Sequence, residues 1–136
     1  MKQKYLVDTN ILVRLLINDD LKQHTDLLNL LRTKEIEFFV PSLVIFETYW
    51  VLSSRYKIDK DNIVSFMIEF NDANNVFLEE SALIYSTLTI FKNTNVDFVD
   101  TYLSEKARLV NLPVLTWNKK DFNKLKSESY APFELL

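Results

Sequence analysis

Short apolar segments with strand character alternate along this chain with longer segments that carry apolar residues at helical spacing. The pattern predicts strands at residues 4–7, 37–40, 75–78 and 113–116, and an edge strand at 131–136. It predicts helices at residues 9–17, 21–33, 41–56, 59–70, 80–91, 97–110 and 119–125. Such alternation is typical of an α/β fold built in layers around a mainly parallel sheet.

The chain has 136 residues, which fits a single domain over residues 1–136. Apolar residues make up 48% of the chain and charged residues 26%, a composition typical of a folded globular protein. We find no repeat, no low-complexity tract, no apolar run long enough to span a membrane and no signal segment. We therefore expect a cytoplasmic protein without membrane association.

Three residue types are missing or nearly missing, and their scarcity excludes several kinds of site. The chain has no glycine, which excludes a P-loop, a glycine-rich dinucleotide turn and a Gly-x-Ser-x-Gly nucleophile elbow. It has no cysteine and one histidine, which excludes disulfides, thiolate metal sites and sites that need a histidine pair. The net charge of −3 argues against a broad electrostatic grip on nucleic acid. Basic residues could still contribute locally, although a solvated surface is the simpler interpretation for each: Arg14, Arg55, Arg108, Lys119 and Lys120.

Acidic residues follow the predicted strands or lie near the starts of the predicted helices. Asp8 follows the first strand, Glu47 lies about two turns into the helix after the second, and Asp97 and Asp100 share one helix face. In parallel α/β sheets, sites form outside the carboxyl ends of the strands, so we expect these acids to be gathered at one edge. Thr116 and Asn118 follow the fourth predicted strand.

Each acid also has a purely structural interpretation. Asp8 and Asp97 stand where helix N-caps are expected, although capping does not exclude metal binding through the other carboxylate oxygen. Asp100 lies favourably near the positive end of its helix. Glu47 lies in a helix that is apolar on nearly every side, so we expect it to be buried and to need a cation. The alternative is that Glu47 lies on a wet stripe beside Thr48 or pairs with an arginine.

Carboxylates gathered without histidine or cysteine suit a hard cation such as Mg²⁺ or Mn²⁺. Such ions activate water and clamp phosphate oxygens, so the residues predict metal-assisted phosphoryl chemistry. They do not distinguish RNA from DNA.

Four segments, in order, resemble the motifs of PIN-domain proteins, and specifically of the small VapC-like toxins. The segments are residues 6–12 (LVDTNIL), 41–47 (PSLVIFE), 97–102 (DFVDTY) and 113–122 (PVLTWNKKDF). The resemblance covers nearly the whole chain. It implies a PIN-like three-layer fold with a central sheet of about four to five strands and helices on both faces.

The resemblance also implies an activity and partners. The protein would be a metal-dependent endoribonuclease, the toxin of a type II toxin–antitoxin pair, forming a homodimer and binding a cognate antitoxin. Asp8, Glu47 and Asp100 would hold Mg²⁺ or Mn²⁺, and Asp97 would be an auxiliary catalytic acid. Thr9 and Thr116 would orient the carboxylates.

The fourth motif departs from the family pattern, because Asn118 stands where an Asp is common. An amide offers one neutral oxygen, which puts a second metal ion in doubt, although Asp121 is placed to compensate.

Two alternatives remain open at this stage. One is a catalytically silent PIN-like module that binds RNA or a protein. The other is a phosphatase with Asp8 as its nucleophile, but Asn10 stands where such enzymes usually have a second Asp.

Trp117 and Tyr102 are candidates for base stacking, although packing is the simpler expectation for both.

Overall fold

The computed structural model describes residues 2–33 and 35–136. The chain forms two compact units, Met1–Ser81 (unit 1) and Ala82–Leu136 (unit 2). The prediction of one domain over residues 1–136 stays a prediction.

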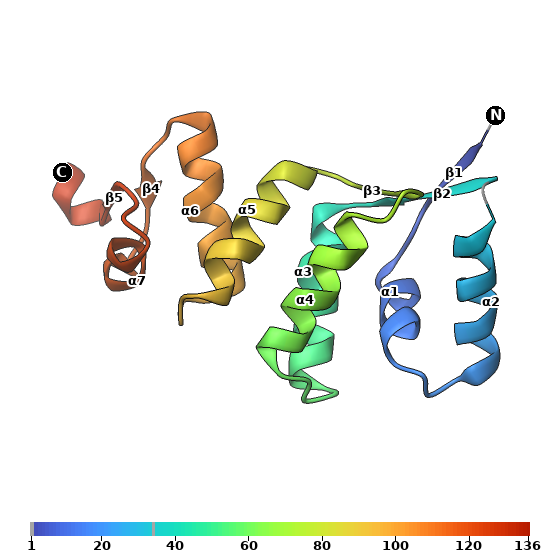
Figure 1. Cartoon of the computed structure of the whole chain (residues 1–136). Helices are drawn as coiled ribbons and strands as arrows, with labels where there is room; N and C mark the ends of the chain where they lie inside the picture. Colours follow the sequence, from blue (N-terminus) through green and yellow to red (C-terminus); the bar gives the residue numbers. More distant parts are fainter. Residues whose placement is uncertain (1, 34) are drawn as a thin grey trace. The chain divides into compact units, whose positions relative to one another are not determined.

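Unit 1 is built on a three-stranded parallel sheet with the order β1-β2-β3 (Figure 1). Tyr5 pairs with Phe38, and Phe38 pairs with Val76. Phe38 and Val76 are buried, which fixes one face of the sheet toward the core because a shift of one residue would turn both side chains outward. The strand bounds are Gln3–Leu6 (β1), Ile36–Val40 (β2) and Val76–Leu78 (β3).

Within residues 2–33 and 35–81, four helices complete unit 1, and in Figure 1 they are drawn below the sheet. Contacts join α1 to both α2 and α3, α3 to α4, α2 to β2, and α4 to β3. Asp8, Asp20 and Asp59 are the N-caps of α1, α2 and α4, and each side chain accepts a hydrogen bond from a backbone N–H of the first turn. The helix bounds are Thr9–Leu16 (α1), Leu21–Arg32 (α2), Ser42–Ser54 (α3) and Lys60–Asn71 (α4).

Unit 2 contains three α-helices, a two-stranded parallel sheet and a terminal 3₁₀ helix. Val96, Phe122 and Leu125 form a buried cluster, and Ile90 and Val114 pack against it. The bounds are Ser81–Lys92 (α5), Phe98–Val110 (α6), Val114–Leu115 (β4), Lys119–Lys124 (α7), Ser129–Tyr130 (β5) and Pro132–Leu135 (η1).

The predicted α/β class with mainly parallel strands is confirmed. In the described part of the chain, five strands lie in two sheets, one of three strands and one of two. The predicted edge strand at 131–136 is wrong: the strand is Ser129–Tyr130, and Pro132–Leu135 is the 3₁₀ helix η1. Pro132 stands at the first helical turn, where proline is favoured, and the side chain of Glu134 accepts a hydrogen bond from the Ala131 N–H at 2.6 Å.

The chain needs left-handed backbone conformations but has no glycine to supply them. Lys57, Glu80, Asn111 and Lys126 have φ values between 55° and 57°. Asn tolerates this region better than most residues, whereas Lys and Glu adopt it at an energetic cost.

No helix within residues 2–33 and 35–136 is long and apolar enough to cross a membrane.

Candidate functional site

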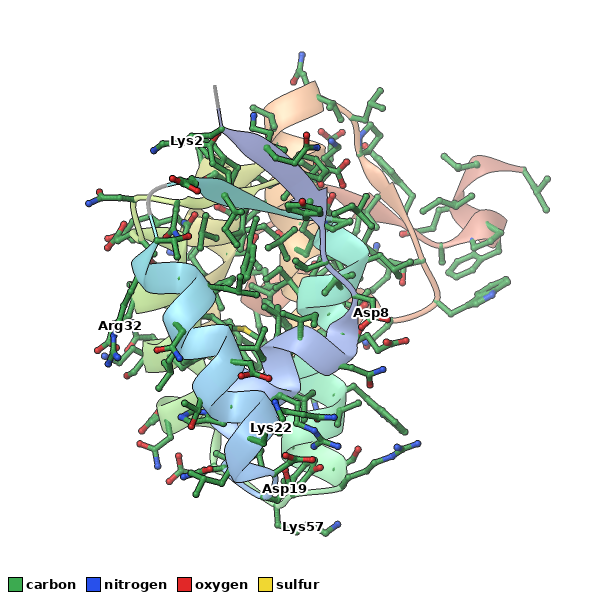
Figure 2. All side chains as sticks on the ribbon, turned by 90° about the vertical axis from the view of Figure 1, so that its right-hand side faces the viewer. Lys2, Asp8, Asp19, Lys22, Arg32 and Lys57 are labelled. Carbon is green, nitrogen blue, oxygen red and sulfur yellow. The ribbon has the colours of Figure 1, made fainter. Side chains whose placement is uncertain are left out.

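Asp8 connects the first strand to the first helix. It lies two residues after β1 and caps α1, with Oδ1 accepting a hydrogen bond from the Asn10 N–H at 2.8 Å. Figure 2 shows it where the ribbon turns from strand to helix. The carboxylate is exposed, and among the described residues Oδ2 has no hydrogen-bond partner. The predicted capping is confirmed, and the second oxygen is available to a ligand.

Glu47 is exposed, so the prediction that it is buried is wrong. Helix α3 turns Ile45 and Thr48 inward, whereas Leu43, Glu47 and Trp50 form its exposed stripe. These three follow one another at spacings of four and three residues, which places them on one helix face. The alternative expectation, that Glu47 lies on a solvent-exposed stripe, is confirmed, although its neighbour Thr48 is fully buried. Glu47 makes no hydrogen bond or ion pair with a described residue.

Asp8 and Glu47 line the same small cavity, of about 200 Å³, which we call the acidic cavity. The start of α1 forms one wall and the first turns of α3 form the other. Because β1 and β2 are parallel, the helices α1 and α3 that follow them both begin at the same edge of the sheet. The hydroxyl of Thr9 makes no hydrogen bond to either carboxylate in the described part of the chain, so its orienting role stays a prediction. The residues that line the cavity are Asp8, Thr9, Asn10, Leu43, Val44 and Glu47.

A contact at the start of α3 was not predicted. The Ser42 N–H donates to Glu79 Oε1 at 3.2 Å, and the Ser42 hydroxyl donates to Glu80 Oε1 at 2.8 Å. Both glutamates directly follow β3, which pairs with β2. The sequence signal was present, since a serine opens a helix after one strand and two acids follow the next.

A second group of acids lies in unit 2, at the start of α6. Asp97 is the N-cap of α6 but makes no side-chain capping bond, so the predicted capping hydrogen bond is absent. Asp100 is half-buried on the first turn. Burial raises the pKa of Asp100 above its ordinary value, and repulsion from Asp97 and Asp121 adds to the rise, whereas the hydrogen bond from Asn118 opposes it. The charged form of Asp100 is therefore destabilised, and a bound cation would relieve it.

Asn118 joins two of these acids. Its Nδ2 donates to Asp121 Oδ2 at 2.8 Å and to Asp100 Oδ2 at 3.4 Å. The Thr116 hydroxyl accepts a hydrogen bond from the Asn118 backbone N–H at 2.9 Å and so shapes the loop before α7. Thr116 therefore supports Asn118 and makes no hydrogen bond to a carboxylate in the described ranges.

Each unit thus carries an incomplete set of metal ligands. Within residues 2–33 and 35–136, no three His, Cys, Asp or Glu side chains are grouped so that they could hold a metal ion. Oxygen donors of this kind fit Mg²⁺ or Mn²⁺, ions that retain several water ligands when few side chains bind them.

The basic and aromatic residues that were candidates for RNA contacts differ in whether an ion pair neutralises them and in how exposed they are. Ion pairs occupy three of the basic residues, Arg14 with Asp19, Arg108 with Glu105, and Lys119 with Glu134. Trp117 is 78% exposed, so the expectation that it is a packing residue is wrong. Tyr102 is half-buried.

Comparison with known proteins gives three findings. The family model for the PIN domain matches residues 5–128. No curated protein sequence matches the chain. Among solved structures, a similar chain is Mycobacterium tuberculosis VapC20, described as a toxin that cleaves the sarcin–ricin loop. It is 18% identical, the match covers 90% of this chain and 95% of that chain, and the TM-score is 0.41.

Proposed function

The chain belongs to the PIN domain family, whose members are typically nucleases that use divalent metals, and we propose that it is a metal-dependent endoribonuclease. The observation that carries this proposal is the acidic cavity, where Asp8 and Glu47 face one space from two different helices. Neither carboxylate is neutralised by a basic side chain in the described residues. Two acids that share a cavity without a counter-charge favour a bound cation.

We assign the metal to Asp8, Glu47 and Asp100. Asp8 can offer Oδ2 while Oδ1 caps α1, and Glu47 can offer both oxygens. When bound, Mg²⁺ or Mn²⁺ activates water and stabilises the charge that develops on the phosphate. Asp97 adds negative charge beside Asp100 and serves as an auxiliary acid. That these acids act together rests on family membership and on the order of the motifs in the chain.

The remaining assigned residues position the ligands. Thr116 fixes the backbone of Asn118, and Asn118 in turn holds Asp121 and partly offsets the rise in the pKa of Asp100. We assign Thr9, which starts α1 beside Asp8, an orienting role as well. An amide at position 118 favours one metal ion over a permanent pair.

The finer biological proposal is that the protein is the toxin of a type II toxin–antitoxin pair. It rests on the resemblance of the four motifs to those of VapC-like toxins. On this proposal the protein is a cytoplasmic homodimer, and a cognate antitoxin covers the acidic cavity.

The test is cleavage of a panel of structured and unstructured RNAs in Mg²⁺, in Mn²⁺ and in excess chelator. The variants are Asp8→Asn, Glu47→Gln and Asp100→Asn. Matched controls are Asp26→Asn, which removes an exposed acid paired with Lys22, and Glu69→Gln, which alters an exposed acid on α4. We expect metal-dependent cleavage that the three site variants reduce by at least about 100-fold and the controls leave unchanged.

A non-catalytic module that binds RNA or a protein is the second candidate, and the amide at position 118 is the observation that favours it. Cleavage of no RNA in either metal, together with equal metal affinity in the wild type and all three site variants, would establish this reading and rule out the nuclease. Hydrolysis of phosphomonoesters but not of RNA would instead point to a phosphatase.

A further inference from the structure

A second cavity adjoins the acidic cavity in unit 1. It has a volume of about 360 Å³, lies between α1 and α3, and is lined among others by Arg14, Glu47, Trp50, Arg55 and Tyr56; we call it the Trp50 cavity. The two cavities share Glu47 and the start of α1, so they adjoin each other. A volume of this size falls in the range of small-molecule sites, which is about 300–1,000 Å³.

Trp50 and Arg55 form the exposed wall of the Trp50 cavity. Trp50 lies one helical turn after Glu47 on the same face of α3 and is 58% exposed. The guanidinium carbon of Arg55 lies 5.9 Å from the centre of the Trp50 ring. Within the described ranges Arg55 has no carboxylate partner, so its charge is available to an anion.

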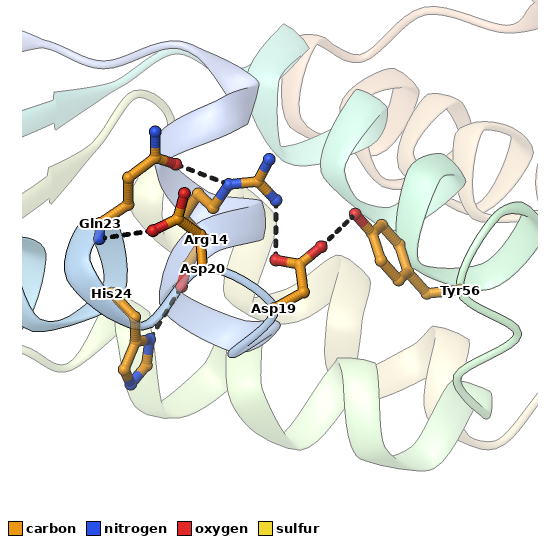
Figure 3. Close-up of polar contacts among 6 residues, drawn as sticks. All are labelled: Arg14, Asp19, Asp20, Gln23, His24 and Tyr56. Carbon is orange, nitrogen blue, oxygen red and sulfur yellow. Dashed lines mark hydrogen bonds and ion pairs between the residues drawn. The ribbon is translucent and has the colours of Figure 1, made fainter.

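A network of hydrogen bonds holds Arg14 and Tyr56, two further lining residues of the Trp50 cavity (Figure 3). Arg14 Nη1 pairs with Asp19 Oδ1 at 2.9 Å, and Arg14 Nε donates to Gln23 Oε1 at 2.8 Å. The Tyr56 hydroxyl donates to Asp19 Oδ2 at 3.4 Å. Arg14 and Tyr56 are therefore oriented before any ligand binds, which lowers the entropic cost of binding.

This combination of groups favours a nucleotide. An exposed indole gives a flat surface on which any base can stack, and a guanidinium without a carboxylate partner can bind phosphate. We propose that the Trp50 cavity binds a single-stranded nucleotide of the RNA substrate next to the scissile phosphate, with its base on Trp50 and its phosphate on Arg55. This inference rests on the proposed function, because the acidic cavity supplies the neighbouring cleavage site.

The first test measures RNA binding without cleavage, in excess chelator. The probes are fluorescein-labelled single-stranded hexaadenylate and hexauridylate. We expect Trp50→Ala to weaken binding roughly 5- to 150-fold, which corresponds to the stacking of one base, and Trp50→Phe to retain most of the affinity. Arg55→Ala should weaken binding and reduce the salt dependence by about one phosphate contact. The controls are Tyr85→Ala and Arg32→Ala, which remove an exposed aromatic ring and an exposed arginine from other helices.

The second test uses the fluorescence of tryptophan, because the chain has only two, Trp50 and Trp117. In the Trp117→Phe variant, all tryptophan emission comes from Trp50, and we expect RNA to quench it. In the Trp50→Phe variant, RNA should leave the emission of Trp117 largely unchanged.

These measurements separate the inference from the proposed function. Quenching of Trp50 by RNA with no cleavage in any metal would support the Trp50 cavity and overturn the nuclease. Cleavage with unquenched Trp50 and unchanged affinity in Trp50→Ala would overturn the Trp50 cavity and leave the nuclease standing. A wild type that binds neither oligonucleotide would also overturn the Trp50 cavity.

Discussion

The side-chain amide of Asn118 donates a hydrogen bond to the carboxylate of Asp121 across 2.8 Å. The same amide nitrogen lies 3.4 Å from the Asp100 carboxylate. Asn118 therefore places a neutral donor between two acids, where a carboxylate would repel both of them. The amide lessens charge repulsion in the metal-free protein at the expense of a metal ligand.

Replacing Asn118 by Asp should strengthen divalent metal binding. The new carboxylate adds charge and a second oxygen donor, and we expect Mn²⁺ affinity to rise about fivefold or more, equivalent to about 1 kcal/mol. Isothermal titration calorimetry checks this. Asn118→Ala is the control, because it removes the amide without adding charge and should not strengthen binding. Equal Mn²⁺ affinity in wild type and Asn118→Asp would show that position 118 does not contact the metal.

Asp100 should make the stability of the metal-free protein depend on pH. Burial, followed by the charges of Asp97 and Asp121, raises the pKa of Asp100 above its ordinary value of 3.8. Below that value both the folded and the unfolded states hold the proton, so Asp100 has no effect. As the pH rises through the folded-state pKa, ionisation destabilises the folded state.

Asp100→Asn should therefore stabilise the metal-free protein at neutral pH, and the gain should shrink as the pH falls toward 4. Urea denaturation in chelator between pH 4 and pH 8 measures the difference. Saturating Mg²⁺ should reverse the order, because the wild type then gains binding free energy that the variant lacks. A constant difference across the pH range would contradict the raised pKa.

Comparing Asp8→Ala with Asp8→Asn should separate the role of Asp8 as the N-cap of α1 from its proposed role as a metal ligand. Asn keeps a side-chain oxygen that can accept from the Asn10 N–H, whereas Ala loses the cap of α1. We expect Asp8→Ala to lower the free energy of unfolding by about 0.5–2 kcal/mol and Asp8→Asn to leave it nearly unchanged. Both should abolish metal binding. Denaturation in chelator gives the stability, and a large loss in Asp8→Asn would mean that the charge itself stabilises α1.

Local sequence signals predicted most of the fold because the chain is locally consistent. Asp8, Asp20 and Asp59 each mark a helix start, and the apolar spacing places the first four strands within one residue of their bounds. The prediction for the terminal segment is wrong because its apolar residues are compatible with a strand or a 3₁₀ helix. The hydrogen bond from the Ala131 N–H to the Glu134 side chain stabilises the 3₁₀ helix.

The site was harder to predict because the apolar pattern of α3 does not indicate which face of the helix is buried. Between Leu43 and Leu52 every residue of α3 except Glu47 and Thr48 is apolar or aromatic, so the pattern does not show which face is buried. The expectation that Glu47 points inward is therefore wrong, since Glu47 is exposed. The neighbours of Glu47 depend on tertiary packing. The bonds from Ser42 to Glu79 and Glu80 cross from one strand end to the next, so the sequence shows the polar residues but not that they meet.

Lys126→Gly should stabilise the protein. Lys126 directly follows the C-cap of α7 with φ of 57°, a conformation that costs a residue with a Cβ roughly 1–2 kcal/mol. The greater freedom of glycine in the unfolded chain offsets part of the gain, so we expect up to about 1 kcal/mol. Lys126→Ala is the control, since it removes the charge but keeps the Cβ and should gain nothing. Equal unfolding free energies for the two variants would show that the backbone of Lys126 is unstrained.

Glu134→Gln should strengthen RNA binding at low salt by releasing Lys119. Lys119 Nζ lies 2.8 Å and 2.9 Å from the two carboxylate oxygens of Glu134. The hydrogen bond from Lys119, and then the one from the Ala131 backbone, lower the pKa of Glu134, so the pair is intact at neutral pH and is lost only as the pH falls through that lowered pKa. With the carboxylate removed, Lys119 can contact phosphate, and the salt dependence of binding should steepen by up to about 0.7, the slope for one contact to a single strand.

The control is Glu128→Gln, which makes the same charge change at the partner of the Tyr130 hydroxyl. Titrations of labelled RNA at several salt concentrations give both slopes. If Glu128→Gln steepens the slope as much as Glu134→Gln, the effect comes from net charge, and Lys119 has no specific part in holding RNA.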